Sequence, residues 1–164
     1  MSGARSGIGF DSHAFSDGGT LVLGGVAFPD VPALKGHSDG DALVHAIIDA
    51  LLGAAGLGDI GQLFPDTSPE VKGISSLKML AIVFEKLNSA GFSPAHVDAV
   101  VVADRPKLAP ARDRMAAAMA GVLKLSPVDI SIKGKTQEGL SWFSGASGGV
   151  AVWATANIEG KEPK

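Results

Sequence analysis

The sequence predicts an α+β fold, an α/β two-layer sandwich in which helices pack on one face of a mixed sheet. Long segments have apolar residues at helical spacing. Segments that are rich in β-branched residues, or that alternate apolar and polar residues, lie before and after them. No segment repeats, and none has the composition of a linker. We therefore expect the order ββ-α-α-β-α-β-β in a single domain over residues 1–164, with a frayed tail at 159–164.

The first strand is expected over residues 8–15, and it carries two polar side chains of interest. Asp11 and His13 are two positions apart, so both point to the same face of the strand. The run Asp17-Gly18-Gly19 favours a tight turn, which predicts a hairpin with a return strand over 20–28.

The central helix follows a loop at 29–34 and has the clearest pattern in the chain. Its apolar face is formed by residues three and four positions apart, namely Val44, Ile47, Ile48, Leu51 and Leu52. Asp39 or Asp41 can cap its start. Asp41, His45 and Asp49 follow one another at intervals of four on a stripe that borders the apolar face, so we expect His45 to be half buried.

The second half of the chain supplies further helices and strands. Glycine, proline, aspartate and threonine at 58–69 predict an irregular loop. We expect amphipathic helices over 76–90 and 110–123, and strands over 97–103, 128–133 and 149–157. Pro110 suits the first turn of the last helix.

Composition excludes several classes of partner. A net charge of −3 and a pI near 5.7 leave no electrostatic footprint for nucleic acid. No apolar run approaches the length of a membrane span, and no secretory leader is visible. The absence of cysteine excludes disulfides and thiolate metal ligands, and it fits a reducing compartment. We expect the protein to work in the cytoplasm of a bacterium, and a plastid-type organelle stays open as the alternative compartment.

Three residues form a candidate metal site. Asp11 and His13 on one strand face, together with His45 on the helix, are hard or borderline ligands. An Asp-His-His set with an open fourth position suits catalytic zinc, or manganese or iron(II). The alternative is that Asp11 caps a turn while the two histidines are unrelated polar residues.

Other clusters suit phosphate. Residues 37–41 lie at a helix start, where backbone N–H groups and the dipole favour an anion, although ordinary capping explains the same residues. Residues 133–138 and 104–107 follow strands and combine lysine with hydroxyl or carboxylate groups, although solvated turns have similar compositions. No serine or cysteine nucleophile stands out. Groups suited to metal and phosphate, without a nucleophile from the protein, favour phosphoryl chemistry in which the protein positions groups and neutralises charge.

Several longer motifs carry a resemblance. They are Gly9-Phe10-Asp11-Ser12-His13, Leu23-Gly24-Gly25, His37-Ser38-Asp39-Gly40-Asp41 with His45, Gly58-Asp59-Ile60-Gly61 and Phe64-Pro65-Asp66-Thr67. From about residue 7 to 155 the chain resembles the 2-C-methyl-D-erythritol 2,4-cyclodiphosphate synthase family. The resemblance implies a homotrimer with active sites between subunits. It also implies a phosphorus–oxygen lyase that cyclises 4-diphosphocytidyl-2-C-methyl-D-erythritol 2-phosphate and releases CMP, in the non-mevalonate route to isoprenoid precursors.

The resemblance also assigns roles to residues. Asp11, His13 and His45 would bind zinc (or manganese), Glu138 would hold magnesium or manganese on the diphosphate, and His37 and Thr136 would stabilise the transition state. The implied substrate-binding residues are Asp11, Ser12, His13, His37, Ser38, Asp59, Ile60, Gly61, Phe64, Pro65, Asp66, Ala103, Asp104, Arg105, Pro106, Lys107, Leu108, Ala109, Lys135, Thr136, Gln137 and Glu138. Those at 103–109 and Lys135 would come from the neighbouring subunit. From the helix stripe alone, we expect Asp49 to orient His45 or an adjacent helix.

The chain departs from the family pattern in places. Arg105-Pro106-Lys107-Leu108 stands where many members have Ala-Pro-Lys-Met, and Lys135 replaces a frequent threonine. Residues 140–149 lack the arginine and the acidic residue of the usual LGF-x-GR-x-EG pattern. In the family those charges face a central channel where terpenoid diphosphates sit, so we expect this chain to bind such effectors weakly or not at all.

Two other functions fit parts of the pattern. A zinc-dependent phosphohydrolase would activate water on the same metal and release orthophosphate instead of a cyclic product. A trimeric, metal-stabilised binding protein with lapsed activity would show no turnover, but it would have little use for His37, Thr136 and Glu138.

Overall fold

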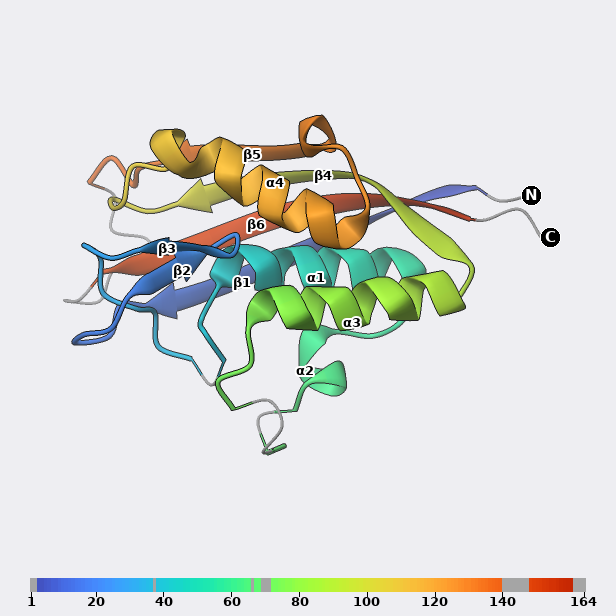
Figure 1. Ribbon diagram of the computed structural model, residues 1–164, viewed down its shortest axis with the longest axis horizontal. Helices are drawn as coiled ribbons and strands as arrows, with labels where there is room; N and C mark the ends of the chain where they lie inside the picture. Colours follow the sequence, from blue (N-terminus) through green and yellow to red (C-terminus); the bar gives the residue numbers. More distant parts are fainter. Residues whose placement is uncertain (1–2, 37, 66, 69–71, 140–147, 161–164) are drawn as a thin grey trace.

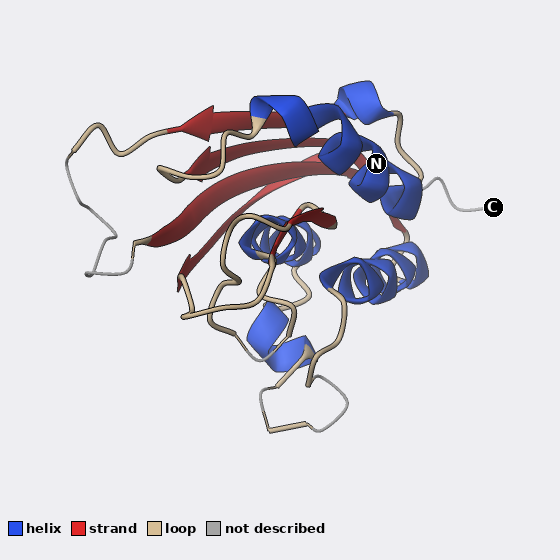
Figure 2. Cartoon of the chain, turned by 60° about the vertical axis from the view of Figure 1, so that its left-hand side comes forward, coloured by secondary structure: helices blue, strands red, loops and turns tan. Residues whose placement is uncertain are grey.

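The computed structural model describes residues 3–36, 38–65, 67–68, 72–139 and 148–160. A four-stranded sheet has the order β1 (Ala4–Ala14), β6 (Gly149–Gly160), β4 (Phe92–Val102) and β5 (Ile130–Lys135). β4 and β5 are parallel, and the other pairs are antiparallel. The long helices α1 (Ala42–Ala55), α3 (Ser76–Ser89) and α4 (Arg112–Leu123) all lie on one side of it (Figures 1 and 2). The predicted class, a mixed sheet with helices on one face, is confirmed.

The predicted N-terminal hairpin is wrong. β1 pairs along its whole length with β6, at the other end of the chain. The segment expected as a return strand folds on itself, as β2 (Leu21–Leu23) and β3 (Val26–Phe28). Its turn is formed by Gly24 and Gly25, with φ of 57° and 73°. Paired positive φ values match the twist of a two-residue hairpin, so this local turn closes a small sheet of its own.

The predicted helices have nearly the observed bounds. α3 ends one residue earlier than expected, and Pro110 lies in a 3-10 turn, η1 (Ala109–Ala111), that leads into α4. Two short helical turns were not predicted, α2 (Ile60–Leu63) inside the expected loop and η2 (Pro127–Asp129). Each is only one turn long, too short to show an apolar period.

Three strands extend beyond their predicted bounds, whereas β5 begins two residues after the expected start at 128, because Pro127–Asp129 form η2. β1 begins four residues before the expected start at residue 8, and β4 begins five before residue 97. β6 continues through Glu159 and Gly160, which pair with Ala4 and Phe92, so the predicted tail at 159–164 begins too early. Residues 161–164 lie outside the described part of the chain. Among the described residues, no helix is long and apolar enough to cross a membrane.

Two glycines bring α1 against the sheet. A Cβ at Gly7 or Gly9 would collide with the carbonyl oxygens of Ala50 and Ala46 on α1. Only glycine therefore allows the helix backbone to rest directly on β1. Asp11 continues the same alternation, so it faces α1 as Gly7 and Gly9 do.

The sheet face away from the helices is open. Ile8 is 71% exposed and Phe10 45% exposed, and the ring of Phe10 lies 4.9 Å from that of its cross-strand partner Trp153. Apolar side chains gathered on one exposed face are typical of an interaction surface.

Candidate metal and substrate site

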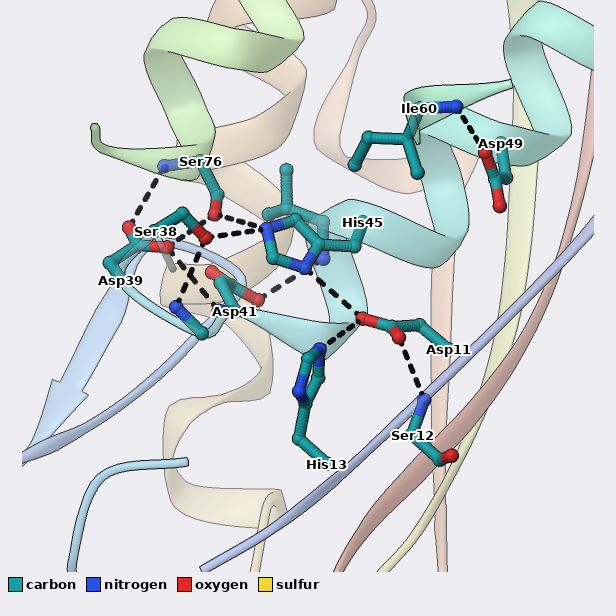
Figure 3. Close-up of polar contacts among 12 residues, drawn as sticks. Asp11, Ser12, His13, Ser38, Asp39, Asp41, His45, Asp49, Ile60 and Ser76 are labelled. Carbon is teal, nitrogen blue, oxygen red and sulfur yellow. Dashed lines mark hydrogen bonds and ion pairs between the residues drawn. The ribbon is translucent and has the colours of Figure 1, made fainter. Parts of the chain in front are cut away.

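The three predicted metal ligands meet between β1 and α1 (Figure 3). His13 Nε2 lies 2.9 Å from Asp11 Oδ2, and His45 Nδ1 lies 3.1 Å from the same oxygen. One ligand atom from each residue falls within 4.8 Å of the others. The arrangement follows from the glycine contacts, because the helix that carries His45 lies directly over the strand that carries Asp11 and His13.

The electrostatics of the trio favour a cation. Burial opposes ionisation of Asp11, but its interactions with the rings of His13 and His45 outweigh that effect and lower the pKa of Asp11 to about 2. The bond to Asp11 raises the pKa of His13, against the effect of burial. One carboxylate and two imidazoles form a donor set that fits zinc, manganese or iron(II). The chemistry of the site therefore suits the predicted metal.

His45 is more buried than the stripe predicted. It is 8% exposed, and both ring nitrogens are engaged. Nδ1 faces Asp11, while Nε2 lies 2.9 Å from Ser76 Oγ and 3.1 Å from Ser38 Oγ. The ring is therefore held from both sides.

Asp41 is the cap of α1, one of the two predicted candidates. Its carboxylate accepts hydrogen bonds from Val44 N at 3.1 Å, Gly24 N at 2.9 Å and Gly25 N at 2.7 Å. It thus ties the β2–β3 turn to the helix start. Burial raises the pKa of Asp41 to about 6, although these N–H groups act in the opposite direction.

Asp49 holds an adjacent helix, the second of its two predicted roles. Its Oδ1 accepts the N–H of Ile60 at 2.8 Å. Asp59 caps the same short helix through Gln62 N at 2.8 Å. Together they place α2 beside the trio.

A cavity of about 210 Å³ opens over the trio. Of the predicted substrate residues, it is lined by Asp11, His13, Ser38, Ile60, Gly61 and Phe64. Phe10, Gly36, Asp49 and Met79 also line it and were not predicted to bind substrate. Met79 could have been suspected, because it lies three residues after Ser76 on the inner face of α3.

A second cavity of about 260 Å³ lies at the ends of β4 and β5. It is lined by the predicted residues Ala103, Asp104, Pro106, Lys107, Leu108, Ala109, Lys135 and Thr136, and by Val101, Arg112 and Gly134, which were not predicted. No described residue lines both cavities. Arg105 does not line the second cavity, and its guanidinium carbon lies 4.9 Å from the centre of the Phe15 ring.

Hydrogen bonds join the two loops of the second cavity. Asp104 accepts the backbone N–H and the side-chain amide of Gln137, each at 3.2 Å. Ala103 N donates to Lys135 O at 2.9 Å. Thr136 Oγ1 donates to the carboxylate of Glu138, so these two predicted functional groups are in contact.

Some predicted residues fall outside these cavities. Ser12, Asp59, Pro65, Gln137 and Glu138 line neither of them, and Ser12 N donates to Asp11 Oδ1 at 2.8 Å. His37, Asp66 and residues 140–147 lie outside the described part of the chain.

Comparison with known proteins matches nearly the whole chain. The model of the YgbB family matches residues 4–159. The chain is 50% identical over 154 residues to a 2-C-methyl-D-erythritol 2,4-cyclodiphosphate synthase from Pelotomaculum thermopropionicum, a match that covers 94% of each protein. Among solved structures, it superposes with a TM-score of 0.85 and 37% identity on a synthase of the same name in a CDP-bound form, over 94% of this chain and 99% of that one.

A second solved structure is larger. The chain superposes with a TM-score of 0.92 and 38% identity on the bifunctional IspDF of Campylobacter jejuni. The match covers 99% of this chain and 44% of that one, so the chain spans less than half of the bifunctional protein.

Proposed function

This chain belongs to the YgbB family, and on that basis we propose that it converts 4-diphosphocytidyl-2-C-methyl-D-erythritol 2-phosphate into 2-C-methyl-D-erythritol 2,4-cyclodiphosphate and CMP. The reaction is a step in non-mevalonate isoprenoid biosynthesis. The observation that carries the proposal is the convergence of Asp11, His13 and His45, in a chain half identical to a synthase of that name. A cysteine-free sequence is compatible with a bacterial cytoplasm as the site of action.

The chemistry needs no nucleophile from the protein. An oxygen of the substrate's 2-phosphate forms a bond to the β-phosphorus while the bond from that phosphorus to the bridging oxygen breaks, and CMP leaves with the bridging oxygen. The chain's task is to fold the substrate so that these atoms lie in line. Thr136 and His37 would donate hydrogen bonds to the phosphate oxygens on which charge develops.

Metal ligands fit the same reaction. We propose that Asp11, His13 and His45 hold zinc or manganese, and that Glu138 helps to hold magnesium or manganese on the diphosphate. Bound ions supply positive charge that neutralises phosphate oxygens. Asp49 and Asp59 keep α2 beside the cavity and so shape the pocket for the methylerythritol group.

We propose that the active enzyme is a homotrimer. The trio lines one cavity of the chain, and residues of the segments 103–109 and 135–136 line another, so a neighbouring copy would complete each site. The open sheet face with Ile8 and Phe10 supplies the apolar surface that such an assembly buries.

Light scattering after size-exclusion chromatography should give three times the chain mass. Ile8→Glu should lower that mass, and a monomer with full activity would rule the assembly out.

A phosphorus NMR time course tests the reaction itself. With substrate, zinc and magnesium, two coupled diphosphate resonances should appear together with CMP. His45→Ala should abolish them, whereas His96→Ala, which changes a histidine outside the trio, should not. Orthophosphate in place of the cyclic product would identify a phosphohydrolase. A folded, zinc-loaded assembly without turnover would identify a binding protein.

A further inference from the structure

Behind His45, on the side away from Asp11, lies a short chain of buried and partly buried polar groups (Figure 3). Nε2 of His45 is 2.9 Å from the hydroxyl of Ser76, the first residue of α3. Ser76 has no exposed surface. None of the motifs that identify the family site includes this serine, and it does not line the cavity over the trio.

Asp39 determines how Ser76 is oriented. Its Oδ2 accepts the N–H of Ser76 at 2.8 Å, and its Oδ1 accepts the hydroxyl proton of Ser76. The N–H of Asp41 also points to Oδ1, at 3.3 Å. Ser75, the N-cap of α3, makes no side-chain cap bond, so Asp39 caps this helix from another segment. Each of these contacts brings a donor to the carboxylate.

The number of available protons determines which nitrogen of the His45 ring carries a hydrogen. A serine hydroxyl has one proton. Because Ser76 gives that proton to Asp39, it can only accept a hydrogen bond from His45. The 2.9 Å contact is then a hydrogen bond only if Nε2 carries the hydrogen, with Ser38 Oγ at 3.1 Å as a second acceptor for it. Nδ1 is then the nitrogen whose lone pair is directed at the metal position.

We propose that Ser76, oriented by Asp39, is a positioning residue that keeps the His45 hydrogen on Nε2 and leaves Nδ1 free to bind a metal. A residue with this role is needed because Asp11 Oδ2 lies 3.1 Å from Nδ1. A carboxylate is a strong acceptor, and alone it would attract a hydrogen onto Nδ1. That hydrogen would occupy the direction a metal needs. Ser76 offers a competing acceptor at the opposite nitrogen.

Zinc affinity of the full chain, measured by competition with a chelator, tests this role. The inference rests on the metal site of the proposed function. Outer contacts to a metal-bound histidine typically change affinity 10- to 100-fold. Ser76→Ala should therefore raise the zinc Kd about 10- to 100-fold, and Ser76→Thr, which keeps the hydroxyl, should stay near the wild-type value. Ser75→Ala is the matched control, because the neighbouring hydroxyl makes no cap bond, and it should change Kd less than about twofold.

A second measurement needs no variant. Nitrogen-15 NMR of the histidine rings in the metal-free wild type, well above the usual histidine pKa, should show the His45 hydrogen on Nε2. A hydrogen on Nδ1 would overturn the proposal. So would equal zinc affinity in wild type and Ser76→Ala, or a loss in Ser76→Ala that a folded Ser76→Thr does not restore. Failure of the wild type to bind zinc would instead count against the metal site itself.

Discussion

At the scale of single residues, Asp41 holds more of the local structure than a helix cap usually does. One buried carboxylate accepts N–H groups from α1 and from the two glycines of the β2–β3 turn. Asp41→Asn would turn an amide N–H₂ toward one of those donors. At mildly acidic pH we expect it to lower the free energy of unfolding by about 1–3 kcal/mol. Urea unfolding of the metal-free protein measures this, and Asp30→Asn, on the exposed surface, should change it by less than about 0.5 kcal/mol.

The same residue predicts a pH dependence. Burial raises the folded-state pKa of Asp41 to about 6, above that of an unfolded aspartate. A carboxyl with a raised pKa contributes stability below its unfolded pKa, and that contribution is lost as the pH rises through the folded value. The stability advantage of wild type over Asp41→Asn should therefore shrink between about pH 4 and just above pH 6. An advantage that grows with pH over that range would show that the N–H groups outweigh burial.

The three residues of the trio could be predicted from the sequence, but Ser76 and Asp39, which lie behind His45, could not. Spacing puts Asp11 and His13 on one strand face and His45 at the border of a helix. The contact of Ser76 with His45 spans 31 positions, and that of Ser76 with Asp39 spans 37. No local pattern reports such contacts, because they depend on how α3 packs against α1.

At the scale of elements, local pattern predicted the long helices and failed for the first hairpin. Helical periodicity lies within a single segment, whereas the partner of β1 is β6, at the far end of the chain. The turn signal at 17–19 was local and strong, but the Gly24-Gly25 turn closed the hairpin instead. Pairing between distant strands is information that a short sequence window does not hold.

The contact between α1 and β1 predicts a paired effect on stability and metal binding. Gly9→Ala would push its methyl group into the carbonyl oxygen of Ala46. We expect a loss of about 1–3 kcal/mol in the free energy of unfolding, and weaker zinc binding because His45 moves away from Asp11. Gly53→Ala is the control within α1, where a Cβ would meet its nearest atom at 3.9 Å. It should keep zinc affinity and gain up to about 1 kcal/mol, through higher helix propensity. Equal zinc affinity in both variants would contradict the close-contact argument.

At the scale of the whole molecule, the prediction for isoprenoid diphosphates remains to be tested. The departures from the family pattern lie at 140–149, and residues 140–147 are outside the described structure. Because the usual arginine and acidic residue are missing there, we expect farnesyl diphosphate to bind weakly or not at all. Isothermal titration of the assembled protein measures this. Tight binding of one ligand per trimer would refute it. Restoring an arginine at one position of 140–147 should strengthen binding if charge is the cause.

The pairing of β1 with β6 also determines how the molecule responds to force. Ala4 pairs with Glu159 at one end of this antiparallel ladder, and Ala14 pairs with Gly149 at the other. β1 begins and β6 ends on the same side of the molecule (Figure 1). Tension between the termini would thus load the ladder bonds one after another, as a zipper opens, and not all together. Peeling would start at Ala4 and reach Asp11 and His13 late, so a protein pulled from its ends would keep the cluster of Asp11, His13 and His45 in place until most of the strand pair had opened.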